Sequence, residues 1–467
     1  MNKTILSLFI LFFSFSLAQE NEAILGKWNG SLNVQGMKLP LVLKINSNEG
    51  ELDASLDSPS QNAYGIPITY ISFVEDSLHF KVEAANISYK GLLKEKEIEG
   101  TFKQGMFSTE LKLTRNKEKT EVEKKVQEPS KPYPYDEEEV VFENKVENFK
   151  LAGTLTTPRG EGPFPAIIMI SGSGAQDRNS EILGHKPFLV VADYLTRKGM
   201  AVLRYDDRGT AASEGDFEEA TSEDFKQDAI AAIEYLKTRP EIDTTKIGVF
   251  GHSEGGMIAP MISSHPDVNF LVLIAPPVAP IDQLLLLQQE LIGELSGMSP
   301  SELTLNRNIN KSLYELIKNT EDEELPKMFT AFWKETLEAY PKLAKSQGLS
   351  EEVFISYQEE AYLNPWMLYF LRFDPKQNLH DTKIPVLGLF GEKDMQVSAK
   401  QNEPLLKEYI AKNNASNRIK TLKDLNHLMQ LAETGSPSEY AENKDTFSEK
   451  ALKEILTWLQ DIKVLRK

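Results

Sequence analysis

The chain has 467 residues and no cysteine, which excludes disulfides, thiolate metal sites and a cysteine nucleophile. Its formal net charge of -18 argues against nucleic acid as a partner, because a polyanion would be repelled. A hydrophobic content of 40% is ample for packed cores, and the length favours two domains over one.

Residues 1–18 have the layout of a secretory signal peptide. One lysine precedes an apolar stretch from Ile5 to Phe15, and the small-residue end Ser16-Leu17-Ala18 follows. The apolar part is shorter than the roughly 20 residues that a spanning helix needs, which disfavours a membrane anchor. We therefore expect cleavage after Ala18, export to the periplasm or the extracellular space, and no membrane span in the mature chain.

Residues 19–115 predict a small all-β domain, a sandwich or a barrel. Alternation such as Leu78-His79-Phe80-Lys81-Val82 is typical of half-buried antiparallel strands. Strand-like segments occur at 39–45, 65–73, 77–84, 87–94, 97–105 and 108–114. No chemistry-bearing residues converge in them, which favours a packing or accessory role over a specific ligand site.

Residues 116–139 are dense in charge and then in proline, so they predict a linker between two domains. From residue 140 to 467 the pattern changes to buried strands separated by helices, which predicts a mostly parallel sheet. The expected strands lie at 165–170, 201–205, 246–250, 270–274 and 385–390, with helices at 187–198 and 222–238 between them. Residues 280–378 carry helical patterning without a clear strand, which predicts a helical cap inserted over a site.

The segment Gly251-His252-Ser253-Glu254-Gly255 fits G-x-S-x-G, the sharp strand-to-helix turn that exposes a nucleophilic serine. The pattern alone is weak, since a plain glycine turn can match it. Here a buried strand precedes it and a small-residue helix start follows. Ser253 is therefore the predicted nucleophile, and the N–H of Glu254 is a predicted oxyanion donor.

A serine nucleophile needs a histidine base oriented by a carboxylate. His427 is the only one of the six histidines that lies after the strand at 385–390. Asp394, on the loop after that strand, is the predicted acid, in preference to Glu392 and Asp424.

The second oxyanion donor should come from the small-residue loop after the strand at 165–170. We predict the N–H of Ser173, with that of Gly172 as the alternative. In the same loop we expect Asp177 and Arg178 to pair and hold its shape.

From about residue 140 onward the chain resembles an α/β-hydrolase, and specifically the bacterial serine esterases with an S-G-S-G-x-Q-D-R oxyanion loop. The stretch Pro365 to Pro375 resembles a Pro-Trp…Phe-Leu…Asp-Pro segment of those proteins. Asp206 to Ser213 resembles the D-x-R-G-x-G-x-S turn found across the fold, with an alanine in place of its second glycine. The resemblance implies an α/β-hydrolase fold with a helical cap, and hydrolysis of carboxylic esters with small acyl groups.

The leading hypothesis is an exported serine carboxylesterase that acts on a small-molecule ester, with sugar-linked acetyl or aromatic esters among the candidates. Trp366, Tyr369 and Phe370 are candidate acyl-pocket residues, and cap core is an equal alternative for them. We expect no cofactor and no metal, and the oligomeric state stays open. The runner-up within the same chemistry is a serine peptidase or amidase. A non-catalytic exported binding protein is the alternative from a different class.

Overall fold

The computed structural model describes residues 23–34, 37–48, 51–58, 63–82, 87–104, 107–115, 125–346, 349–410 and 414–466. The chain forms two compact units, one of Met1–Glu123 with Tyr340–Glu351 and one of Lys124–Ala339 with Glu352–Lys467. The expected signal peptide, residues 1–18, lies outside the described residues. Within the described residues, no helix has the length and apolar content needed to cross a bilayer.

The first unit is built on one antiparallel sheet of nine strands, in the order β4-β3-β2-β1-β9-β8-β7-β6-β5. Its strands are β1 (Gly26–Val34), β2 (Met37–Asn48), β3 (Glu51–Ser58), β4 (Ala63–Pro67), β5 (Tyr70–Val74), β6 (Ser77–Val82), β7 (Ile87–Lys94), β8 (Glu97–Gln104) and β9 (Phe107–Thr114). Only Ile68 and Thr69 separate the two edge strands β4 and β5. The N–H of Ile68 donates to Ala54 of β3 and that of Thr69 to Lys81 of β6, so the sheet curls until its edges meet.

Alternation along the strands places the apolar side chains of the first unit in one core. In β6, Leu78, Phe80 and Val82 are buried while the residues between them are more exposed. Trp28 and Tyr89 are among the largest side chains of this core. The sequence pattern did not single out β1 and β3, because β3 is interrupted by acidic and hydroxyl residues that alternate with its buried Ala54 and Leu56.

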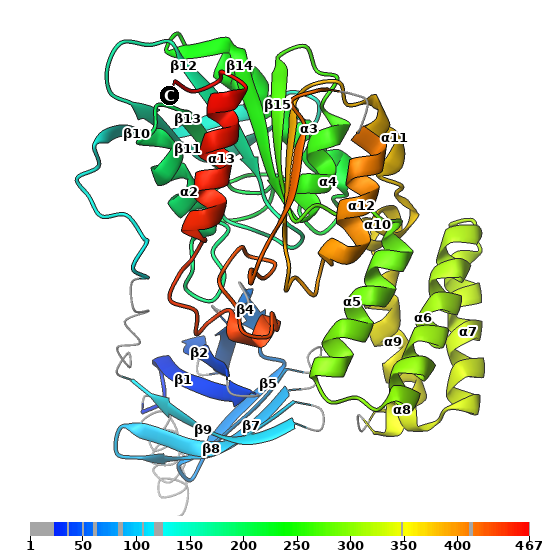
Figure 1. The fold of residues 1–467 in the computed structure, drawn as a ribbon. Helices are drawn as coiled ribbons and strands as arrows, with labels where there is room; N and C mark the ends of the chain where they lie inside the picture. The colour runs from blue at the N-terminus through cyan, green and yellow to red at the C-terminus, as the bar shows by residue number, and fades with distance from the viewer. Residues whose placement is uncertain are drawn as a thin grey trace, which may run out of the picture. The chain divides into compact units, whose positions relative to one another are not determined.

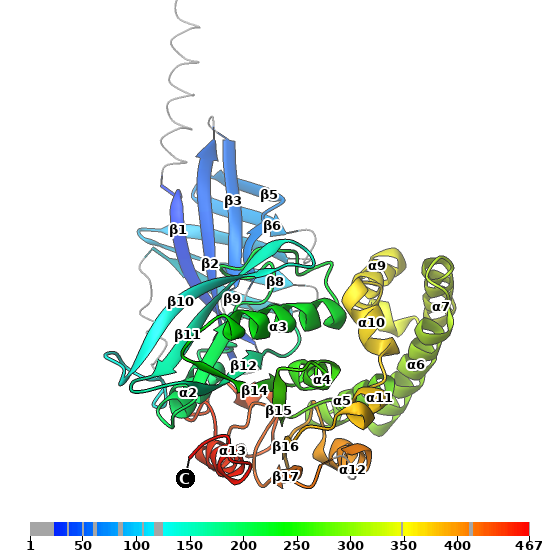
Figure 2. The same cartoon turned by 90° about the horizontal axis from the view of Figure 1, so that it is seen from above.

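The second unit contains a mixed sheet of eight strands in the order β10-β11-β13-β12-β14-β15-β16-β17 (Figures 1 and 2). Its strands are β10 (Tyr135–Asn144), β11 (Phe149–Pro158), β12 (Phe164–Ile170), β13 (Ala201–Tyr205), β14 (Ile242–His252), β15 (Val268–Ile274), β16 (Val386–Gly391) and β17 (Arg418–Leu422). β11 pairs antiparallel with both of its neighbours, and every other pair is parallel. The carboxyl ends of β12 to β17 therefore meet along one edge of the sheet.

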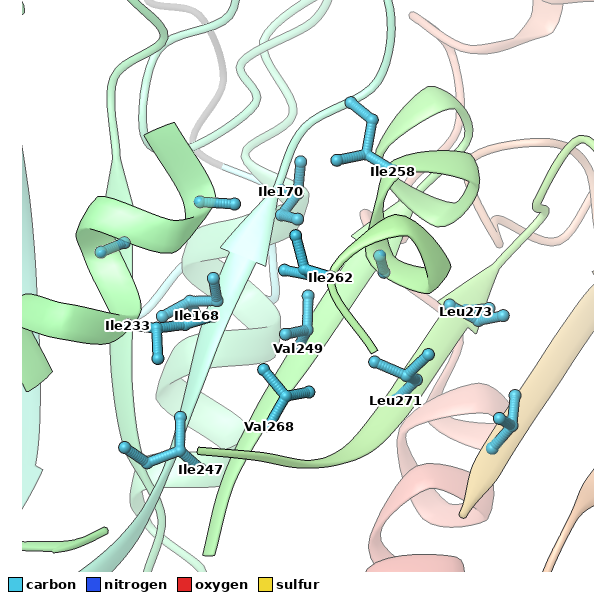
Figure 3. Packing of buried hydrophobic residues seen from close by; sticks show 14 of the residues in the cluster. Ile168, Ile170, Ile233, Ile247, Val249, Ile258, Ile262, Val268, Leu271 and Leu273 are labelled. Atoms are coloured by element: carbon cyan, nitrogen blue, oxygen red, sulfur yellow. The ribbon is translucent and has the colours of Figure 1, made fainter. Parts of the chain in front are cut away.

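Two apolar cores lie on opposite faces of this sheet, because successive side chains of a strand point to opposite sides. On β12, Ile168 and Ile170 belong to one core, and Ile167 and Met169 to the other. Figure 3 shows the first core, in which strand side chains pack against α4. Helices α3 (Ser222–Lys237), α4 (Glu254–Met261) and α12 (Ala399–Ile410) cover that face, and α2 (Pro187–Thr196) and α13 (Glu449–Asp461) cover the other.

A run of helices interrupts the sheet between β15 and β16, as the sequence pattern predicted. In the second unit they are α5 (Ile281–Leu295), α6 (Pro300–Asn319), α7 (Leu325–Ala339), α9 (Glu351–Tyr362), α10 (Pro365–Arg372) and α11 (Lys376–Asp381). The short helix α8 (Lys342–Lys345) belongs to the segment that clusters with the first unit. Asn364 caps α10 by accepting a hydrogen bond from the N–H of Met367, and Pro365 occupies the first helical position.

The expected linker at 116–139 ends earlier than the sequence suggested. Its last residues, from Tyr135 onward, form the first half of β10. Before them, Gln127 accepts hydrogen bonds from the N–H groups of Thr446 and Phe447 and donates one to the Phe447 carbonyl. The charged run was misread as linker because β10 is an edge strand, whose outward face tolerates acidic side chains.

Candidate active site

Ser253 lies at the junction of β14 and α4 in a strained backbone conformation, with φ 53° and ψ -120°. Glycine is required on both sides of it. A β-carbon on Gly251 would lie 2.1 Å from the carbonyl oxygen of Gly255, and one on Gly255 would lie 2.2 Å from that of Ile170. The turn is therefore too tight for side chains at the flanking positions, which is the physical content of the G-x-S-x-G pattern.

The imidazole of His427 and the carboxylate of Asp394 form a hydrogen bond of 2.8 Å between Nδ1 and Oδ2. Both side chains are buried. The other Asp394 oxygen accepts hydrogen bonds from the backbone N–H groups of Gln396, at 2.9 Å, and Val397, at 2.8 Å. The carboxylate is thus fixed on the loop after β16. It holds the imidazole of His427, which follows β17, through Nδ1, and Nε2 is the ring nitrogen that is left to accept a proton.

The two other acids considered from the sequence have different partners. Glu392 accepts a hydrogen bond from the N–H of Asp424, and the Asp424 carboxylate lies 3.4 Å from the ammonium of Lys393. In the part of the chain that the structure describes, no hydrogen bond joins the Ser253 hydroxyl to His427. Such bonds are often long before substrate binds, so the roles of Ser253, His427 and Asp394 stay a prediction.

The loop after β12 approaches Ser253 closely. A β-carbon on Gly172 would lie 3.2 Å from the Ser253 β-carbon and 3.5 Å from Nδ1 of His252. Among the described residues, the N–H groups of Gly172, Ser173 and Glu254 donate to no protein acceptor. These are the three donors that the sequence analysis proposed for the oxyanion, and all three are free to receive one.

The turn that begins at Asp206 holds this loop in place, a role that the sequence analysis missed. Asp207 accepts hydrogen bonds from the Ser171 hydroxyl at 2.7 Å and from the Gln176 N–H at 2.9 Å. Burial raises the pKa of the Asp207 carboxyl, and the nearby Glu254 carboxyl adds to the rise. Asp207 therefore ties the turn after β13 to both ends of the oxyanion loop.

The expected Asp177–Arg178 pair is not formed. Arg178 makes a forked contact with Asp206, with Nη2–Oδ2 at 2.6 Å and Nε–Oδ1 at 3.0 Å. Asp177 instead accepts from the backbone N–H groups of Asn179 and Glu181. Neighbours in sequence were a poor guide here, because Asp206 is brought alongside by the sheet and can satisfy the planar guanidinium at two atoms.

His252 contacts the predicted base directly. Its Nε2 lies 3.0 Å from the carbonyl oxygen of His427, and the two rings are 4.9 Å apart between centroids. Burial, together with the neighbouring imidazole of His427, lowers the pKa of His252 to about 3. A neutral ring can donate from Nε2, so His252 supports the backbone of His427 across the neutral pH range.

The side chain of Glu254 is buried, at 2% exposure, and points into the protein rather than to solvent. Its Oε1 accepts hydrogen bonds from the Ser222 hydroxyl at 2.5 Å and from Nε1 of Trp366 at 2.8 Å. Burial raises the pKa of this carboxyl. Glu254 and Asp207 also line a small cavity of about 10 Å³, close to the size of one water molecule.

The three candidate pocket residues have different environments. Trp366 bonds to Glu254 and stacks on Phe370, with ring centroids 4.9 Å apart, and Phe370 is buried. Tyr369 lines a cleft of about 620 Å³ beside α10, and its hydroxyl lies 3.5 Å from Glu223. Their assignment to an acyl pocket therefore stays a prediction.

One group of described side chains has donor atoms close enough to hold a metal ion: Glu234, His265 and Asp267, with these atoms within 4.8 Å of one another. The ammonium of Lys237 lies 3.0 Å from Glu234 and 2.8 Å from Asp267. One lysine ammonium already pairs with both carboxylates, so an ion-pair network explains the group.

The model of the X-Pro dipeptidyl-peptidase (S15) family matches residues 147–408. Esterase EstD of Thermotoga maritima is 29% identical over 310 residues, which cover 66% of this chain and 65% of that protein. The chain thus spans less than two thirds of the length of EstD. The protein YtaP of Bacillus subtilis is 31% identical over 118 residues, 21% of this chain and 38% of that protein. The esterase Pf2001 of Pyrococcus furiosus has a TM-score of 0.42 at 17% identity, over 70% of this chain and 93% of that one.

Proposed function

The chain belongs to the X-Pro dipeptidyl-peptidase (S15) family, and on this premise we propose that it is a serine hydrolase that cleaves carboxylic esters with short acyl groups. The observation that carries the proposal is the convergence of Ser253, the His427–Asp394 pair and the unpaired N–H groups at the carboxyl edge of one sheet. The similarity to EstD supports esters as the substrate class.

In the proposed mechanism, the Ser253 hydroxyl attacks the ester carbonyl while Nε2 of His427 accepts its proton. Asp394 holds the imidazole in the required tautomer and stabilises the imidazolium. The oxyanion is received by the N–H of Glu254 and by that of Ser173 or Gly172. The protonated His427 then gives its proton to the leaving alcohol. Water deprotonated by His427 hydrolyses the acyl-enzyme in the second half of the reaction.

Peptidase activity is the second candidate, because the matching family is described by an X-Pro dipeptidyl-peptidase. Such an enzyme needs a carboxylate free to bind the substrate's terminal amine. The carboxyls described around Ser253 already have partners: Asp394 bonds to His427, Glu254 to Trp366 and Asp207 to the oxyanion loop. This supports carboxylic esters over peptides as the substrate class.

The deciding experiment offers the purified protein 4-nitrophenyl acetate, longer acyl esters and an X-Pro anilide. Ser253→Ala serves as the control for each substrate. We expect ester turnover that rises toward short acyl chains and is lost in Ser253→Ala. Preferential cleavage of the anilide would favour the peptidase, and no turnover of any substrate would favour a non-catalytic binding protein.

We further propose that the protein is exported to the periplasm or the extracellular space and loses residues 1–18. The basis is the charged, apolar and small-residue layout of that segment together with the absence of cysteine. Cell fractionation with mass measurement of the mature N-terminus tests this. A protein that begins at Gln19 outside the cytoplasm is expected, and an intact Met1 in the cytoplasm would contradict it.

A further inference from the structure

Three helices of the second unit meet at one oxygen atom beside the nucleophile. Oε1 of Glu254, in the first turn of α4, accepts from Ser222 in the first turn of α3 and from Trp366 in the first turn of α10. α3 and α4 cover the sheet, whereas α10 belongs to the helices inserted between β15 and β16. The carboxyl is therefore a direct hydrogen-bonded link from the cap to the turn that carries Ser253.

The acceptor end of the link is buried, which makes the bond costly to break. Glu254 is 2% exposed and Ser222 is fully buried, so an acceptor that lost its donors would stay away from water. Trp366 is held on its other side by the stack on Phe370, with the rings inclined by only 14°. Opening the cap at α10 would thus leave a buried carboxyl oxygen with one hydrogen bond instead of two.

The same residue serves the reaction through a different atom. Its backbone N–H is a predicted oxyanion donor, and the position of that N–H depends on the first turn of α4, which the side chain anchors. The side chain itself lines the small cavity that Asp207 and Gly172 of the oxyanion loop also line.

We propose that Glu254 is a positioning residue that fastens the cap helix α10 over the nucleophile through Trp366, so that cap closure and substrate binding depend on this one hydrogen bond. The proposal rests on the proposed ester hydrolysis for its kinetic consequence. The fastening itself is a property of the fold and can be measured without any substrate.

The test removes either partner of the bond and follows hydrogen exchange of the α10 peptide, residues 365–372. Trp366→Phe removes the donor and keeps a ring, and Glu254→Ala removes the acceptor. Each is expected to speed exchange in α10 about tenfold, and the double variant no more than Glu254→Ala alone, because Glu254→Ala already removes the bond that Trp366→Phe removes. Glu254→Gln keeps an acceptor oxygen and should restore slow exchange.

Trp333→Phe is the matched control. Trp333 lies in α7 of the cap, and its Nε1 is buried without a hydrogen-bond partner among the described residues. The same Trp→Phe change there removes no hydrogen bond, so exchange in α10 should stay at the wild-type rate. Equal acceleration in Trp333→Phe and Trp366→Phe would overturn the proposal, because loss of ring volume would then explain both.

Kinetics provide the second measurement. With 4-nitrophenyl acetate we expect Trp366→Phe to raise KM about tenfold. Glu254→Ala should raise KM by as much and also lower kcat, because its side chain anchors the turn that carries the predicted oxyanion N–H, and Glu254→Gln should reverse most of the rise in KM seen in Glu254→Ala. If wild type hydrolyses no ester but α10 exchanges as predicted, the proposed function fails and the fastening stands. If α10 exchange is unchanged in both Trp366→Phe and Glu254→Ala, the fastening is refuted whatever the turnover.

Discussion

Replacement of Ser253 separates the backbone strain of the β14–α4 turn from the chemistry of the serine hydroxyl. At φ 53° and ψ -120° a residue with a β-carbon is held in a sparsely populated region, at a cost of roughly 1–3 kcal/mol. Ser253→Ala keeps the β-carbon and therefore the strain, whereas Ser253→Gly removes both. Glycine gains about 0.4–1 kcal/mol of unfolded-state entropy, which offsets part of the relief. We expect Ser253→Gly to be more stable than Ser253→Ala by about 1 kcal/mol, and both to lack ester hydrolysis.

The assay is hydrogen exchange of the β14 and β15 amides at increasing urea, which reports the unfolding of the second unit alone. The N–H of Ser253 donates to the Ile274 carbonyl at 2.9 Å, so exchange of the Ser253 amide reports directly on the stability of the β14–α4 turn. If Ser253→Ala proves as stable as Ser253→Gly, the serine backbone is not strained, and the reasoning from its dihedral angles is wrong.

Three further predictions concern the surroundings of the serine and the acid stability of the fold. Asp394→Asn should lower kcat/KM for 4-nitrophenyl acetate by on the order of 10³–10⁴-fold, because the amide favours the wrong tautomer of His427; a loss below tenfold would refute the triad. Gly172→Ala places a β-carbon 3.2 Å from that of Ser253, so kcat should fall about tenfold or more, and an unchanged kcat would show that the loop yields freely. Burial lowers the pKa of His185 to about 4, so the unfolded chain binds its proton first as the pH falls below 6.5. The free energy of unfolding should then drop by about 1.4 kcal/mol per pH unit between pH 6.5 and about 4, and urea titrations of His185→Gln should show a shallower slope.

Much of the second unit could be predicted from the sequence, because its buried strands are short apolar runs with clear boundaries. The strand expected at 201–205 is β13 as observed, and the helix expected at 222–238 is α3 to within one residue. β10 and β11 were harder, since β10 is an edge strand with acidic residues on its open face. In the first unit, β3 was not predicted because its polar residues likewise obscure the apolar alternation.

In the site too, residues that belong to a local motif could be predicted from the sequence, whereas contacts between residues far apart in the chain could not. G-x-S-x-G marks the serine because its glycines are a local steric requirement. Arg178 pairs with Asp206, 28 positions away, and Glu254 bonds to Trp366, 112 positions away. No local pattern encodes such contacts. The sequence analysis assigned no role to His252, because its bond to the His427 carbonyl joins residues 175 positions apart.

The central claim is that Ser253 is a nucleophile activated by His427. A fluorophosphonate reagent, which reacts with activated serine hydroxyls, tests it most directly when the labelled protein is digested and the modified peptide is sequenced by mass spectrometry. We predict one adduct per chain, on Ser253, formed at least 100-fold more slowly in His427→Ala, in line with the loss of a general base. Labelling at another residue, or an unchanged rate in His427→Ala, would contradict the claim.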